Sequence, residues 1–138
     1  MEGLKVMINQ LWRHKVEETY DTLKNVINKK IIKVWLDEYE DKLKFIFEDG
    51  SQISIYDDGQ SCCESRYMTT DYDLSKYSEA TFLDIEIKDG GYLNEKWGYE
   101  HQIEFLDIKT NKGVFVIATH NEHNGYYGGF SIIAETIN

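Results

Sequence analysis

The chain has 138 residues, the length of one ordinary domain, and 41% of them are hydrophobic, which excludes a disordered chain. Its formal net charge is −10, from 25 acidic and 15 basic residues, which disfavours a protein that grips nucleic-acid phosphates. No apolar run reaches the length of a membrane span and the first residues lack a signal-peptide pattern, so we expect a cytosolic protein with reduced cysteines.

Residues 1–28 are predicted to be helical. Apolar residues recur between Leu4 and Ile27 at spacings of three and four, which is the helical period. We expect one bent helix or two short ones, ending near Asn28, because asparagine tolerates the left-handed conformation that often closes a helix.

From residue 30 the apolar period changes to two, which predicts strands. Three strands are expected before residue 57, with an Asp-Gly turn at residues 49–50 leading into the third. Residues 57–80 are polar and are predicted to be irregular, apart from a helical turn capped by Asp73. The residues of the three strands predicted to face inward are Ile32, Val34, Leu36, Leu43, Phe45, Phe47, Ile53 and Ile55.

Alternation resumes near residue 82, where Leu83, Ile85 and Ile87 are predicted to share one face. A second hairpin is expected to turn at "TNKG", residues 110–113, and the last strand lies in "GGFSIIAETI". The prediction is therefore a single α+β domain over residues 1–138. Its helical segment, residues 1–28, would pack on an antiparallel sheet of about six or seven strands formed by residues 30–138.

Two adjacent cysteines, Cys62 and Cys63, and the spacing His-x-x-His of His120 and His123 raise the question of a metal site. Adjacent cysteines on a strand point to opposite faces, and structural zinc sites usually separate their cysteines by two to four residues. We therefore expect no metal and no cofactor.

A nucleophilic cysteine is the second interpretation of the same residues. Either cysteine beside His120 and an acid, Glu64 or Glu122, would make a Cys-His-acid arrangement. Their spacing matches no known signature, and small cysteines more often pack as hydrophobic residues. We expect no catalytic residue and no enzyme activity.

The stretch "HNGYYGGF", residues 123–130, predicts a strand kinked by its glycines, where a bulge forms or another backbone approaches closely. Amides and aromatic rings at this kink could stack a base or hold a partner's side chains. The alternative is a structural role, in which the tyrosines cover the glycine-rich strand. The candidate ligand-binding residues are Asn121, Asn124, Tyr126 and Tyr127.

Two stretches, residues 31–65 and 119–130, resemble a family of small uncharacterised domains found mostly in bacteriophages and prophages. The resemblance covers residues 24–138 and is carried by Cys62, Cys63, Glu64 and the stretch from Asn124 to Gly129. This family has no established activity, so no catalytic residue carries over. The resemblance implies a phage context, in which small acidic proteins often act as inhibitors of host defence or as sponges for nucleotide immune signals.

These observations together favour a non-enzymatic inhibitor of the anti-CRISPR type, acting in the cytoplasm of a host cell. It would bind a host defence protein or ribonucleoprotein and occlude its basic nucleic-acid channel, without binding nucleic acid or membrane directly. The alternatives are a sponge for a nucleotide signal and a small phage structural protein, and solubility alone would also explain the charge. The candidate partner-binding acids are Asp37, Glu38, Glu40, Asp41, Asp57, Asp58, Asp71 and Asp73.

Overall fold

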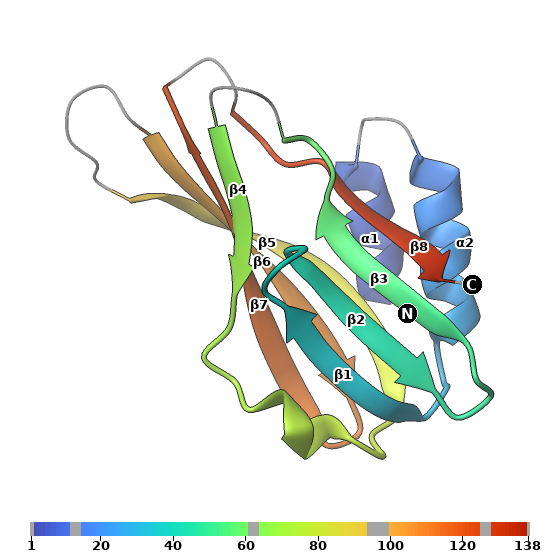
Figure 1. The fold of residues 1–138 in the computed structure, drawn as a ribbon. Helices are drawn as coiled ribbons and strands as arrows, with labels where there is room; N and C mark the ends of the chain where they lie inside the picture. The colour runs from blue at the N-terminus through green and yellow to red at the C-terminus, as the bar shows by residue number, and fades with distance from the viewer. Residues whose placement is uncertain (1, 12–14, 61–63, 94–99, 125–127, 138) are drawn as a thin grey trace.

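The computed structural model of the protein describes residues 2–11, 15–60, 64–93, 100–124 and 128–137. Within these residues the chain forms two α-helices, one short 3₁₀ helix and eight strands (Figure 1). In chain order they are α1 (Glu2–Gln10), α2 (Val16–Val26), β1 (Ile31–Asp37), β2 (Lys42–Phe47), β3 (Gln52–Asp57), β4 (Glu64–Thr69), η1 (Leu74–Tyr77), β5 (Phe82–Leu93), β6 (Glu100–Thr110), β7 (Gly113–His123) and β8 (Ile132–Ile137).

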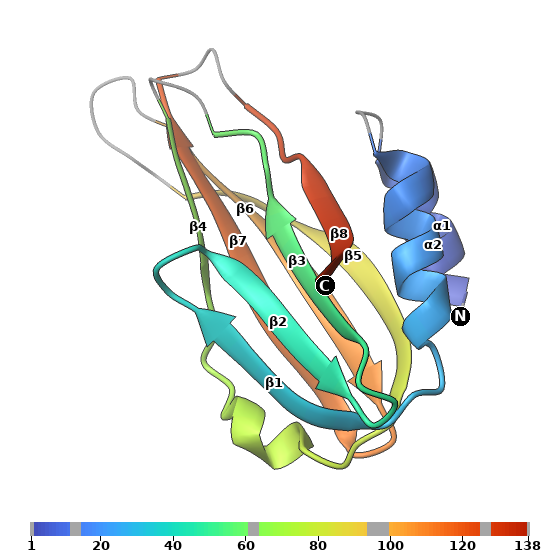
Figure 2. The ribbon, with the colours of Figure 1, turned by 45° about the vertical axis from the view of Figure 1, so that its right-hand side comes forward.

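The strands form two antiparallel sheets of four, in the orders β1-β2-β3-β8 and β4-β7-β6-β5. The sheets face each other as a sandwich, with both helices at one side of it (Figure 2). The α+β class is thus confirmed, but the expected single sheet of six or seven strands is wrong. The alternation of apolar and polar residues shows which face of a strand is buried, but it does not show which strands pair with each other. Here β8 pairs with β3, which is distant in the sequence.

The two helices close the side of the sandwich formed by β5 and β8. Helix α1 packs on β5 and α2 packs on β8, and Leu4 and Leu23 are completely buried there. The carboxylate of Asp84 on β5 accepts hydrogen bonds from the backbone N–H groups of Gly3 and Leu4, at 2.7 and 2.9 Å. Two of the N–H groups left free at the start of a helix are thereby satisfied, and α1 is anchored to the sheet.

Four buried phenylalanines occupy the centre of the sandwich: Phe45 and Phe47 from β2, Phe82 from β5 and Phe115 from β7. The rings of Phe45 and Phe82 meet edge to face with centroids 5.5 Å apart, so aromatic contacts join the two sheets. The predicted inward residues of β2 and β3 are confirmed as buried.

Two β-bulges overturn part of the predicted facing. Ile32 is 42% exposed and Leu83 is 39% exposed, although both were expected to face inward. The register shifts between Ile31 and Lys33 and again between Phe82 and Asp84. An extra residue at each bulge rotates the following side chains, so strict alternation fails at these points.

The predicted turns are confirmed where local chemistry determines them. Asn28 has a left-handed φ of 71° just after α2, and Gly50 has a φ of 85° in the hairpin between β2 and β3. The side chain of Asp73 caps η1 by accepting from the backbone N–H of Ser75. The segment expected to be irregular nevertheless contains β4. One of the inward side chains of β4 is the charged Arg66, so this strand lacks the alternation of apolar residues that would have predicted it.

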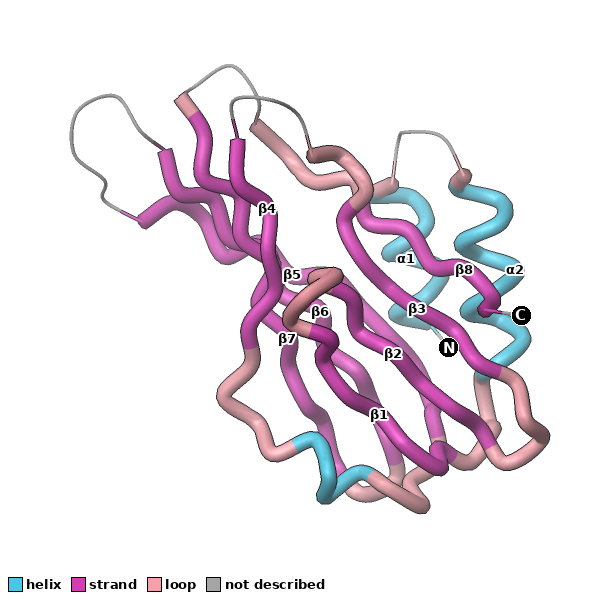
Figure 3. The backbone as a smooth tube through the Cα atoms, in the orientation of Figure 1, coloured by secondary structure: helices cyan, strands magenta, loops and turns pink. Residues whose placement is uncertain are grey.

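The second sheet projects beyond the first at one end (Figure 3). Strands β5, β6 and β7 have 12, 11 and 11 residues, whereas β2, β3 and β8 have six each. At this end the described inward residues of the second sheet include Arg66, Asn121 and Gln102, and they take part in a polar network.

Candidate functional site

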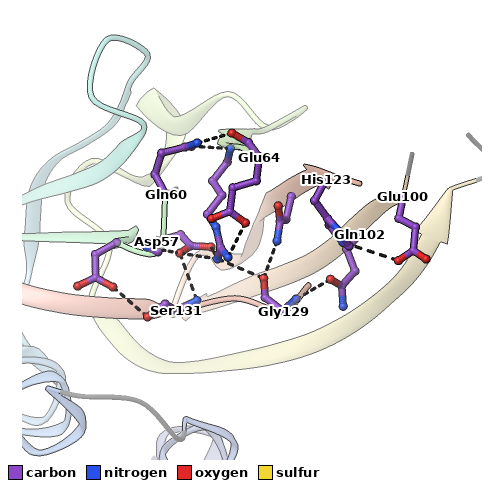
Figure 4. Close-up of polar contacts among 12 residues, drawn as sticks. Asp57, Gln60, Glu64, Glu100, Gln102, His123, Gly129 and Ser131 are labelled. Atoms are coloured by element: carbon purple, nitrogen blue, oxygen red, sulfur yellow. Dashed lines mark hydrogen bonds and ion pairs between the residues drawn. The ribbon is translucent and has the colours of Figure 1, made fainter. Parts of the chain in front are cut away.

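Arg66 on β4 forms a buried ion-pair cluster with Asp57 and Glu64. Figure 4 shows these two acids near Gly129. Arg66 Nη1 lies 3.0 and 2.8 Å from the carboxylate oxygens of Asp57 on β3, and Arg66 Nη2 lies 2.9 Å from Glu64. The side chains of Arg66 and Asp57 are each 4% exposed. Burial acts to lower the pKa of Arg66, but the two carboxylates outweigh it and the pKa is raised, so the guanidinium stays charged.

The same cluster holds the glycine segment before β8. The carbonyl of Gly129 accepts from Arg66 Nη1 at 3.2 Å and from Asn121 Nδ2 at 2.9 Å, and its N–H donates to Gln102 Oε1 at 2.7 Å. Gly129 has a φ of 87°, which favours glycine. Gly129 lies in a bend rather than within a strand, and the groups that contact it are side chains. A Cβ at Gly129 would meet no atom within 4 Å, so the predicted close approach of another backbone is not found at this glycine.

The four predicted ligand-binding residues do not meet as one described surface. Asn121 is fully buried and its amide contacts Gly129, so it faces the interior rather than a ligand. Asn124 is exposed just beyond the end of β7, and Tyr126 and Tyr127 lie outside the described residues.

A cavity of about 290 Å³ opens beside Gly129. Burial, together with the nearby charges of Asp57 and Asp89, raises the pKa of Glu104 in this cavity to about 7. Its carboxyl group therefore changes charge near neutral pH. The lining residues are Gln10, Leu11, Ile87, Asp89, Gln102, Glu104, Gly129 and Phe130.

The turn between β1 and β2 is a compact acidic structure. Asp37 Oδ1 accepts from the backbone N–H groups of Tyr39 and Glu40, and Lys44 Nζ lies 3.0 Å from Asp37 and 2.6 Å from Glu40. The hydrogen bond from Lys44 lowers the pKa of Asp37. This turn leaves the ring of Tyr39 fully exposed at its tip, between two glutamates.

The eight predicted partner-binding acids fall into different environments. Asp57 was expected at the start of an irregular segment, but it ends β3 and its carboxylate is buried against Arg66. Asp58 is half-buried and accepts from Ser131 Oγ at 2.9 Å. The exposed acids of the set are Glu38, Glu40, Asp71 and Asp73, while Asp37 and Asp41 are half-buried.

A groove of about 480 Å³ runs between β1 and the segment from Thr70 to Ser78. Strand β1 is an edge strand of the first sheet. Sequence analysis missed this groove because its two walls are far apart in the chain and the bulge in β1 turns Ile32 outward into it. The lining residues are Ile32, Lys33, Val34, Trp35, Leu36, Thr70, Tyr72, Asp73, Leu74, Ser75 and Ser78.

Thr69, His120 and His101 form a hydrogen-bonded chain on the face of the second sheet that points away from the first. Thr69 Oγ1 lies 2.8 Å from His120 Nε2, and His120 Nδ1 lies 2.8 Å from His101 Nε2. The ring of Tyr67 stacks on His120, with centroids 4.5 Å apart and planes 5° apart. Burial and the neighbouring His101 lower the pKa of His120, and Glu122 opposes them.

The predicted His-x-x-His pair does not converge. His120 faces outward in this chain, whereas His123 is buried on the opposite face of β7, with its Nε2 3.8 Å from Glu100. Among the residues that the structure describes, no three His, Cys, Asp or Glu side chains meet as a metal site. Cys62 and Cys63 lie outside those residues. Sequence analysis identified His120 but missed Thr69 and His101. These two residues are far from His120 in the sequence and meet it only through the pairing of β4 and β6 with β7.

Neither helix of the described chain is long and apolar enough to cross a membrane. No curated protein and no solved structure matches the chain. One family does match, over residues 24–133, and its description is "Domain of unknown function (DUF7448)". The matched region contains β1 to β7 and the first two residues of β8, which is nearly the whole sandwich. Since the match covers most of the chain, the protein belongs to this uncharacterised family, DUF7448.

Proposed function

We propose that the protein is a binding protein that uses the groove along β1 to occupy the basic surface of a partner. The observation that carries this proposal is an apolar groove on an edge strand with acidic side chains beside it. The acidic side chains are that of Asp73, which lines the groove, and those of the turn that follows β1. A partner segment with both apolar and basic side chains complements such a surface.

The apolar part of the groove supplies anchoring contacts. Trp35 and Tyr72 line it, and the side chains of Ile32 and Tyr72 are 42% and 43% exposed. Aromatic residues of this kind dominate the binding energy of many interfaces. Lys33 Nζ lies 4.6 Å from the ring centroid of Trp35, so the ammonium group of Lys33 makes a cation–π contact with this ring.

The charge of the protein supports a basic partner. The net charge of −10 would speed the encounter with a Lys- and Arg-rich surface and would disfavour direct binding of nucleic acid. A nucleic-acid channel is such a surface. We therefore propose a host defence protein or ribonucleoprotein as the partner class, and an inhibitor from a phage or prophage as the biological role.

The proposed function is tested by using the protein as bait in a bacterial lysate and then asking whether nucleic acid competes with the bait. A captured partner should be a nucleic-acid-binding protein, should be released by high salt, and should lose its own nucleic-acid binding as the bait is added. The variant Glu38→Lys/Glu40→Lys/Tyr72→Ala should capture much less of it.

The matched control is Glu17→Lys/Glu18→Lys, which makes the same charge reversal on α2. Helix α2 packs on β8, at the opposite edge of the first sheet from β1. This control should capture the partner as well as the wild type does. If the control weakens capture as much as the groove variant does, or if the partner binds nucleic acid and bait together, the proposal is wrong.

A further inference from the structure

The geometry of Thr69, His120 and His101 matches that of an activated nucleophile. We propose that Thr69 is the nucleophile of an acyl-transfer site, with His120 as its general base and His101 as a positioning residue, and that the site hydrolyses carboxylic esters with a small acyl group. Nucleophile to base and base to orienting group are both within hydrogen-bond distance, at 2.8 Å each. This inference goes beyond the proposed binding function and does not depend on it.

The hydrogen bond between the two imidazoles accommodates the tautomer that this chemistry needs. When His120 Nδ1 carries the proton, it donates to His101 Nε2, and His120 Nε2 is left free to accept from the hydroxyl of Thr69. His101 is 7% exposed, so its position is fixed by the sheet. The stacked ring of Tyr67 holds the plane of His120.

The surroundings of His120 favour its neutral form. The groups that face it are His101 from β6, Tyr67 and Thr69 from β4, and Glu122 from its own strand. Burial and His101 lower its pKa and Glu122 opposes them, so the imidazole is unprotonated at neutral pH. A neutral imidazole within reach of a hydroxyl is the form that removes a proton during attack.

A cavity of about 270 Å³ lies directly beside Thr69 and provides space for the acyl group. Ala118 pairs with Thr69 across the sheet, and Val116 continues the same face of β7 away from His120. Phe105 completes an apolar surface in this cavity. In the proposed complex a short aliphatic acyl chain lies against that surface, beside Thr69.

The proposed reaction is balanced with water as the co-reactant. Thr69 Oγ1 bonds to the ester carbonyl carbon while its proton passes to His120 Nε2. The bond from that carbon to the alcohol oxygen breaks, and the alcohol takes the proton from His120. Water then attacks the threonine ester with His120 again as base, which releases the carboxylic acid and restores the hydroxyl of Thr69.

Two measurements on the full chain test the site: hydrolysis of p-nitrophenyl acetate, and covalent labelling by an alkyl fluorophosphonate located by peptide mass spectrometry. The label should lie on Thr69. Thr69→Val should abolish labelling and lower hydrolysis by at least about tenfold, whereas Thr69→Ser should retain both. His123→Gln, on the opposite face of β7, should leave both unchanged.

His101→Gln separates positioning from structural support. Its acylation rate should fall, and the midpoint of its pH–rate profile should move upward, because removing His101 removes one cause of the low pKa of His120. A purely structural role would lower the rate without moving that midpoint. A label on another residue of the wild-type chain, or Thr69→Val labelled at the wild-type rate, would overturn the proposal.

Discussion

Arg66 and Asp57 form an ion pair that joins the two sheets of the sandwich, because Asp57 ends β3 in the first sheet and Arg66 lies on β4 in the second. Nη1 of the guanidinium contacts both carboxylate oxygens, and Asp57 Oδ1 also accepts from the backbone N–H groups of Gly59 and Ser131. The pair is buried, so its two members depend on each other for compensation of their charges.

Arg66→Met should therefore destabilise the protein severely. The substitution leaves the carboxylates of Asp57 and Glu64 buried without their cation, and losing one member of a buried pair typically costs about 3–5 kcal/mol. Urea unfolding followed by tryptophan fluorescence measures the change. Lys44→Met is the control, because its partners are more exposed and the expected loss of stability is much smaller. Equal losses for the two variants would contradict this account.

Asp57→Lys and Glu38→Lys should differ sharply although both reverse one acid. Asp57→Lys places a second cation beside Arg66 in a buried site, so we expect little folded protein. Glu38 is exposed in the acidic turn, and its reversal should change stability by less than about 0.5 kcal/mol. Circular dichroism during thermal unfolding decides the matter, and a well-folded Asp57→Lys variant would show that the cluster can rearrange.

Glu104→Gln should stabilise the protein at alkaline pH but not in acid. The pKa of Glu104 is raised from 4.5 to about 7 in the folded state, so its stabilising contribution is present below about pH 4.5 and is lost as pH rises through 7. At about pH 8 the amide, which cannot ionise, should add on the order of 2 kcal/mol. Urea unfolding between about pH 4.5 and pH 8 measures this difference in the free energy of unfolding. Glu100→Gln is the exposed control. A constant difference at all pH values would exclude ionisation as the cause.

His120 should titrate below pH 6.5, the ordinary pKa of histidine, because burial and His101 lower its pKa. Its contribution to stability is then complete above pH 6.5 and declines as pH falls below that value, where the unfolded chain takes up the proton more readily. Imidazole proton resonances followed by NMR measure the pKa directly. His101→Gln should raise it, and His123→Gln should leave it unchanged. An unshifted pKa in the wild type would contradict the buried, coupled pair.

Asp84→Ala should loosen α1 from β5. The carboxylate accepts from the N–H groups of Gly3 and Leu4, and a lost N-terminal cap typically costs about 0.5–2 kcal/mol. Hydrogen exchange of the α1 amides should accelerate while that of β2 changes little. Gly3→Ala tests the same contact, because a Cβ there would lie 2.8 Å from the carbonyl oxygen of Ile85. Unchanged exchange in both variants would mean that packing alone holds the helix.

The parts of the fold that sequence analysis predicted depend on neighbouring residues. The pattern of β2 places Phe45 inward wherever the strand lies, and Gly50 and Asn28 adopt the backbone conformations that their side chains allow. The helical segment and the cap at Asp73 follow from the same short-range chemistry.

The division into two sheets and the site residues could not be predicted in this way. Thr69 and His120 are 51 residues apart, and only the register of β4 on β7 makes them neighbours. Arg66 appeared as a polar residue in an irregular segment, since its inward direction depends on a carboxylate in the other sheet. The two bulges shift side chains by one position without any apolar signal in the sequence.

The pairing of β3 with β8 has a consequence for how the chain is made. Residues 52–57 pair with residues 132–137, and α2 packs on the same late strand, where Thr19 Oγ1 accepts from the N–H of Ala134. At the usual rate of about 5–20 residues per second, the ribosome needs several seconds to make the chain between β3 and β8. During that time the nascent protein carries an open strand edge and an uncovered helix face, so chaperones and nascent neighbouring chains meet it before its own last strand does.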